Sequence, residues 1–75
     1  MPKLYSSDDI LKVLQRNGFE FISEKGSHIK YRKQGHPTLT VIIPAGRKQI
    51  PMGTFNSIVR QAALTKETFE KYFWL

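Results

Sequence analysis

Within residues 27–33, Ser-His-Ile-Lys-Tyr-Arg-Lys, the side chains from His28 to Arg32 alternate between those that favour water and those that favour burial. Successive side chains of a β-strand point to opposite faces of its sheet. The alternation therefore predicts a strand that turns Ile29 and Tyr31 toward a core. The opposite face of the same strand then carries His28, Lys30 and Arg32. A chain with this strand needs other elements to cover one face, while the other face is cationic.

Two further runs predict strands beside this one. Residues 19–23 place aromatic side chains at alternate positions, which predicts a half-buried strand, and Lys25-Gly26 predicts the turn that follows. Residues 38–43 are rich in β-branched side chains and end at Pro44. This composition predicts a third strand that pairs antiparallel to the central one.

Helical patterns precede and follow the predicted strands. Residues 6–9 offer a capping serine and carboxylates for a first turn, and an apolar stripe then runs to Asn17-Gly18. A second helix is expected to begin after Thr54 as its N-cap, and Thr65 is expected to cap a short final helix. The side chains expected to face inward from these two helices are Phe55, Ile58, Val59, Ala62, Phe69 and Phe73.

The predicted order is α-β-β-β-α plus a short C-terminal helix. This order describes an α+β fold, in which a three-stranded antiparallel sheet has its helices on one face and leaves the other face open. At 75 residues the chain is expected to form a single domain, residues 1–75.

Composition excludes several classes of site. With no cysteine and two histidines, the chain lacks disulfides, thiolate nucleophiles and a good metal-binding set, so no cofactor is expected. No run approaches the roughly 20 apolar residues of a membrane span, and residues 1–5 are too polar for a signal peptide. We therefore expect a cytoplasmic protein with no membrane partner.

The charge distribution indicates a polyanionic ligand. The formal net charge is +6, and residues 25–66 contain no acidic side chain. A basic domain attracts nucleic acid by long-range forces and by release of counterions from the phosphates. Nucleic acid is thus the leading class of ligand.

His28 is the candidate catalytic residue. An imidazole near neutral pH can accept or donate a proton in phosphoryl transfer, and the neighbouring Lys25, Lys30 and Arg32 would hold the phosphate. The alternative is a surface histidine that only contacts phosphate, which composition alone favours. His36 lies in a Gly-His-Pro turn at the other end of the same predicted strand, which argues against a two-histidine dyad.

Two other groups of residues are candidates for contacts. Arg47 and Lys48 precede the second predicted helix, where the cations and free backbone N–H groups together would receive a phosphate. The alternative is a solvated loop beside a helix cap. Near the chain ends, Tyr5, Tyr72 and Trp74 are candidates for contact with a protein partner.

Four features of the chain occur together in one known family. They are Asn17-Gly18-Phe19 after the first helix, Lys25-Gly26-Ser27-His28 before a basic strand, the β-branched strand ending at Pro44, and the segment Gly53-Thr54-Phe55-Asn56-Ser57-Ile58. With these features at this separation, nearly the whole chain resembles the HicA toxin family of type II toxin–antitoxin systems.

The resemblance implies a fold like that of double-stranded-RNA-binding domains and an endoribonuclease activity on mRNA that blocks translation. It places the family's essential histidine at His28, which raises the catalytic role above the contact role. The residues expected to bind RNA are Lys25, Gly26, Ser27, Lys30, Arg32, Arg47, Lys48 and Thr54. The resemblance also implies a HicB antitoxin that covers the active face, so we expect a monomer when free and a hetero-oligomer with the antitoxin.

Two positions depart from the family pattern. Many members have a histidine in the loop after the third strand, where this chain has Ala45-Gly46-Arg47, and a glycine near the end of the second helix, where this chain has Ala63. The first departure leaves the second proton-transfer group open among water, the substrate 2′-hydroxyl and a lysine. The chain has no carboxylate cluster, which disfavours a two-metal mechanism.

Two alternatives compete with the nuclease hypothesis. One is a non-catalytic double-stranded-RNA reader, but residues 53–57 lack the lysines that such a reader would use at the start of its second helix. The other is a cationic face that only docks an acidic protein. RNA cleavage discriminates between these alternatives and the nuclease.

Overall fold

The computed structural model describes residues 4–74, so the N-terminal residues 1–3 considered above and Leu75 lie outside the described residues. The elements follow the order α1 (Ser7–Arg16), β1 (Glu20–Lys25), β2 (His28–Lys33), β3 (Leu39–Pro44), α2 (Met52–Gln61) and α3 (Lys66–Phe73). The strands form one antiparallel sheet in the order β1-β2-β3. The predicted α+β fold is confirmed.

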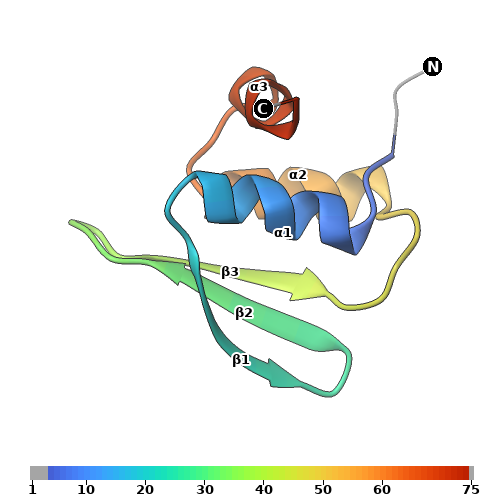
Figure 1. Ribbon diagram of the computed structural model, residues 1–75, viewed down its shortest axis with the longest axis horizontal. Coiled ribbons are helices and arrows are strands. Elements are labelled where there is room, and N and C mark those ends of the chain that lie inside the picture. The colour runs from blue at the N-terminus through green and yellow to red at the C-terminus, as the bar shows by residue number, and fades with distance from the viewer. Residues whose placement is uncertain (1–3, 75) are drawn as a thin grey trace.

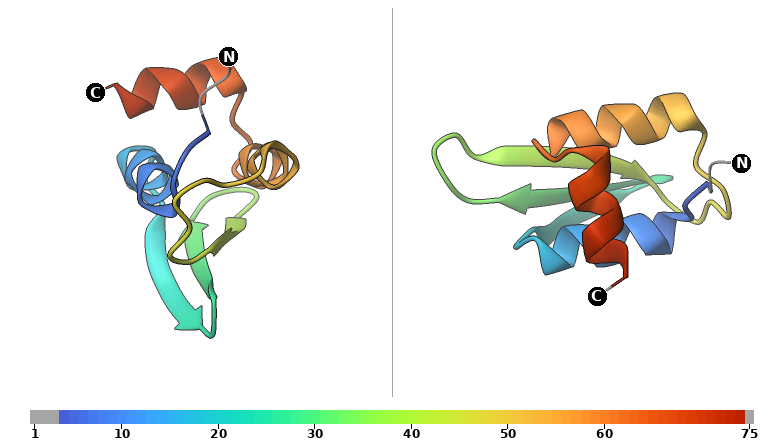
Figure 2. Two further views of the ribbon diagram at one scale, coloured as in Figure 1. Left: turned by 90° about the vertical axis from the view of Figure 1, so that its right-hand side faces the viewer. Right: turned by 90° about the horizontal axis from the view of Figure 1, so that it is seen from above.

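The elements are arranged in three layers. Figure 1 shows α1 and α2 side by side on one face of the sheet, and Figure 2 shows α3 crossing them on the side away from the sheet. No helix in the described part of the chain lies on the opposite face of the sheet, which we call the open face. Among residues 4–74, none of the helices has the length and apolar character needed to cross a membrane.

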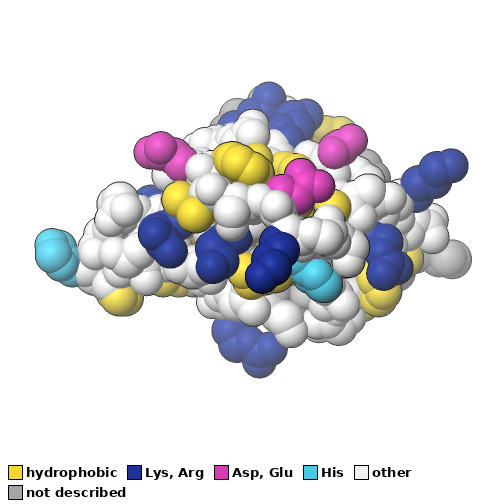
Figure 3. Space-filling model, turned by 90° about the horizontal axis from the view of Figure 1, so that it is seen from below, with side chains coloured by type: hydrophobic (Ala, Val, Ile, Leu, Met, Phe, Trp, Pro, Cys, Tyr) yellow, Lys and Arg dark blue, Asp and Glu magenta, His cyan; other side chains and the backbone are white. Residues whose placement is uncertain are grey.

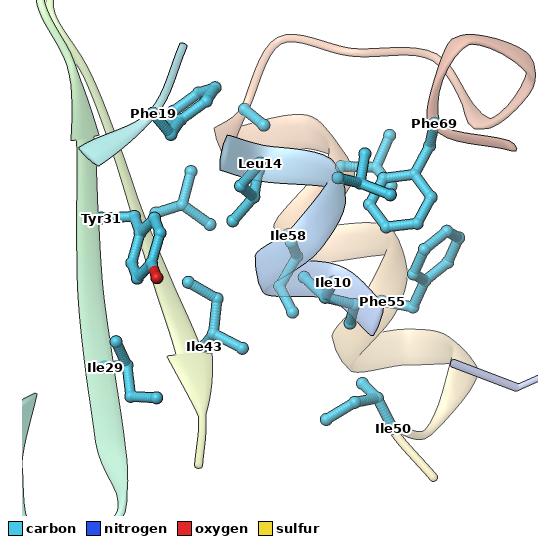
Figure 4. Close-up of a cluster of buried hydrophobic side chains, with 14 residues drawn as sticks. Ile10, Leu14, Phe19, Ile29, Tyr31, Ile43, Ile50, Phe55, Ile58 and Phe69 are labelled. Carbon is cyan, nitrogen blue, oxygen red and sulfur yellow. The ribbon is translucent and has the colours of Figure 1, made fainter. Parts of the chain in front are cut away.

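The core fills the space between the sheet and the two middle-layer helices. Ile29 and Tyr31 of β2 point toward the helices, as the alternation predicts, and meet side chains such as Leu14 and Ile58 (Figure 4). Burial of this apolar surface is the main favourable contribution to folding. Gln15 donates a hydrogen bond from Nε2 to the Tyr31 hydroxyl at 3.0 Å, so the buried tyrosine keeps a polar partner.

A second part of the core joins α3 to the other helices. Phe69 is completely buried and packs edge-on against Phe55, with ring centroids 5.0 Å apart. Tyr5 stacks on Phe55 at 5.1 Å, so this candidate for contact with a partner lies in an intramolecular aromatic cluster. The inward side chains predicted for α2 and α3 are buried, apart from Phe73, which is half-buried.

The first helix begins as its sequence predicts. Ser6 and Asp9 form a capping box, in which the Ser6 hydroxyl accepts from the Asp9 N–H at 3.0 Å and the Asp9 carboxylate accepts from the Ser6 N–H at 3.1 Å. The box satisfies two N–H groups that would otherwise have no partner at this helix end.

The predicted N-cap of α2 is wrong. The helix begins at Met52, with Pro51 as its N-cap residue, and Thr54 lies within the first turn. Pro51 has φ −57° and ψ 147°, the extended conformation from which a chain enters a helix directly, so α2 starts three residues before the position that a Thr54 cap requires. No side chain caps the first N–H groups of this helix.

The α1 and α2 helices end in the same backbone motif. The N–H groups of Gly18 and Phe19 donate to Gln15 and Leu14, and those of Ala63 and Leu64 donate to Arg60 and Val59 in the same pattern. This motif needs a residue with positive φ at its turn, a conformation that glycine adopts without strain. Gly18 has φ 89°. Ala63 has φ 56°, a conformation that its Cβ makes unfavourable.

The prediction that the first strand is half-buried is wrong. Every residue of β1 is exposed, including Phe21 at 57%. The reason is the position of the helices, because α1 and α2 pack over β3 and leave β1 as an uncovered edge. The residue of this segment that reaches the core is Phe19, which lies just before the strand.

Candidate nucleic-acid interface

The register of the strands places three cross-strand rows of side chains on the open face. Residues directly opposite one another in an antiparallel pair point to the same side of the sheet. The rows are Lys25, His28 and Pro44; Ser23, Lys30 and Ile42; and Glu20, Arg32 and Thr40. Figure 3 views this face and shows Lys and Arg side chains gathered beside a histidine.

A β-bulge decides which residues of β1 belong to these rows. Phe21 lies opposite Tyr31 on the helix side, but the register then shifts, so that Ser23 lies opposite Lys30 and Lys25 opposite His28. Ile22 is the extra residue on the bulged strand. If the same residues paired without a bulge, the two-residue period would turn Ser23 and Lys25 to the same side as Phe21. The bulge therefore brings a hydroxyl and an ammonium group to the open face.

His28 is held by the hairpin between β1 and β2. Gly26 has φ 60°, the conformation that the first residue of a two-residue type II′ turn requires, so β2 begins directly at His28. The Ser27 carbonyl accepts a hydrogen bond from the Ala45 N–H at 2.7 Å, which ties this turn to the end of β3. The backbone around His28 is thus fixed on both sides, while its imidazole is exposed.

A hollow of about 280 Å³ opens on this face beside His28. It is lined by Ser23, Lys25, His28, Ile29, Lys30 and Ile42. The lining contains two ammonium groups, one imidazole and no carboxylate. This set of groups can bind a phosphodiester, offset charge that develops on its oxygens, and exchange a proton with it.

The other predicted RNA-binding residues lie outside the hollow. Arg32 is on the open face, one row beyond Lys30 and opposite Glu20. Arg47 and Lys48 are exposed in the loop that follows β3, whose last residue lies opposite His28. Thr54 is half-buried in the first turn of α2, which belongs to the helix layer. The structure therefore brings Lys25, His28 and Lys30 together at the hollow. The other four, Arg32, Arg47, Lys48 and Thr54, lie outside it.

Ser7 fixes the loop that carries Arg47 and Lys48. Its hydroxyl donates to the Pro44 carbonyl at 2.6 Å and accepts from the Arg47 N–H at 2.9 Å, and its own N–H donates to the Arg47 carbonyl at 2.9 Å. The Ser7 side chain is 2% exposed. The start of α1 is therefore linked through one buried serine to the end of β3 and the basic loop.

Sequence reasoning missed three residues that line the hollow, Ser23, Ile29 and Ile42, of which Ile29 was predicted only as a core residue. The sequence pattern of β3 indicates that Ile42 faces outward, because an alternation that buries Val41 and Ile43 turns the residue between them to the other side. No sequence pattern indicates that Ser23 faces outward, since its position depends on the bulge at Ile22, which the alternation in residues 19–23 does not reveal.

The remaining candidates lie away from the hollow. His36 is exposed beyond the far end of β2, as the sequence predicts. Burial raises the pKa of Tyr5, with Glu70 and Asp9 adding to the effect, but Tyr5 packs among the helices. Trp74, at the end of α3, is largely exposed and packs edge-on against Phe73. Within residues 4–74 no group of three or more His, Cys, Asp or Glu side chains is placed to hold a metal ion.

Residues 7–64 match the family described as the HicA toxin of bacterial toxin–antitoxin systems. The chain belongs to the HicA toxin family. The match includes α1, the whole sheet with its open face, and α2, whereas α3 follows the matched residues. No curated protein matches the chain.

Proposed function

We propose that this HicA-family toxin is an endoribonuclease that cuts mRNA and so blocks translation, with His28 as its general acid or base. The observation that carries the proposal is the exposed His28 imidazole beside Lys25 and Lys30, at a hollow on a sheet face that no described helix covers. Membership of the toxin family supports the same conclusion.

The proposed chemistry is attack of the ribose 2′-oxygen on the adjacent phosphorus. One group accepts the 2′-hydroxyl proton, and another donates a proton to the departing 5′-oxygen. His28 performs one of these transfers, which is typically worth about 10² to 10⁴ in rate. The ammonium groups of Lys25 and Lys30 offset the negative charge that builds up on the phosphate oxygens.

The residues around the hollow extend the proposed RNA path. Arg32 follows His28 and Lys30 on the open side of β2, and Arg47 and Lys48 lie in the loop beyond the His28 end of the sheet. Their charges would bind phosphates on either side of the scissile one. Gly26 and Ser27 set the position of His28, and Thr54 would contribute through the uncapped N–H groups at the start of α2.

A toxin of this kind needs a partner that silences it in the cell that makes it. The family supports an antitoxin partner, and we propose a HicB-type antitoxin that covers the open face and excludes RNA from the cytoplasmic toxin. The same face would then serve RNA and the antitoxin in turn, so that the two compete.

The test compares wild type with His28→Ala and with His36→Ala, which removes the other histidine from the far end of β2. Each protein is incubated with a purified mRNA in EDTA, and binding of the same RNA is titrated by filter retention. Wild type and His36→Ala are expected to cut the RNA at equal rates. His28→Ala is expected to be about 10² to 10⁴ slower with its affinity retained.

Other results would count against parts of the proposal. Cleavage by His28→Ala at the wild-type rate would remove His28 from the mechanism. Cleavage by wild type only after addition of a divalent ion would contradict a metal-independent reaction. Binding without cleavage by wild type would favour a non-catalytic RNA-binding module.

A further inference from the structure

The open face is chemically asymmetric from one side to the other. Its β1 and β2 positions carry charged or polar side chains, whereas its β3 positions carry Thr40, Ile42 and Pro44. Ile42 is 37% exposed, although the neighbouring Val41 and Ile43 are completely buried. The hollow therefore has a cationic side at Lys25, His28 and Lys30 and an apolar side at Ile42.

Ile42 is held firmly in this position. Its N–H points away from β2 at the free edge of the sheet and donates to the Gln61 side-chain oxygen at 3.1 Å. Gln61 is the last residue of α2, so the helix layer fixes the backbone of Ile42 from outside the sheet. Because a β-branched side chain also has few rotamers, Ile42 presents a preorganised apolar surface.

The spacing between the two sides of the hollow suits one nucleotide. Lys30 and Ile42 lie directly opposite each other, which puts their Cβ atoms about 5 Å apart. His28 and Ile42 are diagonal neighbours, which lie roughly 7–8 Å apart, and their Cβ atoms are somewhat closer. A phosphate at His28 and the base of the same nucleotide at Ile42 can therefore be accommodated together.

We propose that the hollow binds an unpaired nucleotide of single-stranded RNA, with its phosphate against Lys25, His28 and Lys30 and its base packed on Ile42. This inference deepens the proposed function and rests on it for the identity of the ligand. In a duplex the bases are paired and stacked inside the helix, so their faces are not available to Ile42. Apolar contact with a base face is tolerant of sequence, because every base has such a face.

The experiment measures binding without cleavage. A short 2′-O-methyl oligouridine, which has no free 2′-hydroxyl to attack the phosphorus, is compared with the 2′-O-methyl oligomer of equal length that lacks bases. Wild type is expected to bind the oligouridine roughly three- to tenfold more tightly than the abasic oligomer. Ile42→Thr, which keeps the branch at Cβ and replaces the ethyl group by a hydroxyl, is expected to abolish this preference.

Two matched variants separate base contact from phosphate contact. Ile42→Val, which removes one methylene, is expected to retain most of the preference. Lys30→Ala is expected to weaken binding of both oligomers equally and to lower the slope of log affinity against log salt by about 0.7. Equal urea midpoints for the two Ile42 variants would establish that both are folded alike.

Three outcomes would overturn the inference. The first is equal binding of the two oligomers by wild type. The second is an Ile42→Thr variant that keeps the preference, and the third is tighter binding of an RNA duplex than of the single strand. Oligoglutamate that displaced the RNA at lower concentration than oligouridine would indicate an acidic protein segment as the ligand instead. None of these binding measurements requires RNA cleavage. A wild-type protein that cuts no RNA but still prefers the oligouridine would therefore refute the proposed nuclease activity and support the proposed contact between Ile42 and a base.

Discussion

Neighbouring residues of β3 lie in opposite environments, because Ile43 is completely buried under the helices and Ile42 is 37% exposed on the open face. The same holds along β2, where the buried Ile29 and Tyr31 alternate with His28 and Lys30. Charged groups are costly to bury without partners, and the alternation keeps them in water while the apolar groups build the core. Residues that stabilise the fold and residues proposed to act on RNA therefore differ by one position in the same strands.

The largest stability effect is expected from a pair of substitutions on either side of β3. Ile43→Ala should lower the free energy of unfolding by about 2–4 kcal/mol, since it leaves a cavity in the core. Ile42→Ala should lower it by less than about 1 kcal/mol, because its side chain is already partly in water. Urea denaturation measures both. Equal losses would show that Ile42 on the open face contributes as much packing energy as Ile43 in the core.

A smaller effect is expected at Ser7, which joins the helix layer to the loop beside the open face. Ser7→Ala leaves the Arg47 N–H and the Pro44 carbonyl without their side-chain partner and should cost about 1–3 kcal/mol. Filter binding should also show weaker RNA affinity, because the loop with Arg47 and Lys48 is no longer fixed. The control is Ser57→Ala, because the Ser57 hydroxyl donates to the Gly53 carbonyl on the exposed side of α2. An unchanged RNA affinity for Ser7→Ala would show that binding at the open face does not depend on this link to the helix layer.

The smallest effect is expected at the helix ends, which belong to neither face. Ala63→Gly should raise the free energy of unfolding by about 0.5–1 kcal/mol, because glycine adopts positive φ without strain. Thermal unfolding should shift upward by a few degrees, at about 4–8 °C per kcal/mol. Gly18→Ala should act in the opposite direction. Neither should change cleavage per folded molecule, and a changed rate would show that global stability and site geometry are coupled.

The sequence predicts best those features that depend on nearby residues. The capping box of Ser6 and Asp9 lies within one turn, and the alternation of β2 needs only its own residues. The exposure of Phe21 could not be predicted in this way, because it depends on where α1 and α2 pack. The start of α2 was misplaced because Thr54 has a good capping side chain, whereas Pro51 supplies the required backbone conformation.

The hollow is harder to predict than the strands that form it. Lys25 and His28 come close through a hairpin, which the Lys25-Gly26 pair indicates. Ile42 reaches the same hollow from β3 through the cross-strand register, and Ser23 reaches it through the bulge. A site assembled from three strands is thus specified by pairings that no single segment contains.

The bulge at Ile22 has a consequence for the natural variation that this sheet can tolerate. Lys25 comes four residues after Phe21, whereas their partners His28 and Tyr31 are three residues apart, so β1 carries one extra residue. A chain that lost Ile22 would pair in regular register and would keep its lysine before the turn opposite His28. The bulge therefore lets this strand carry an additional residue without moving that lysine from the open face. Two relatives that differ in length by this one residue would share the architecture and would present the same lysine to a ligand.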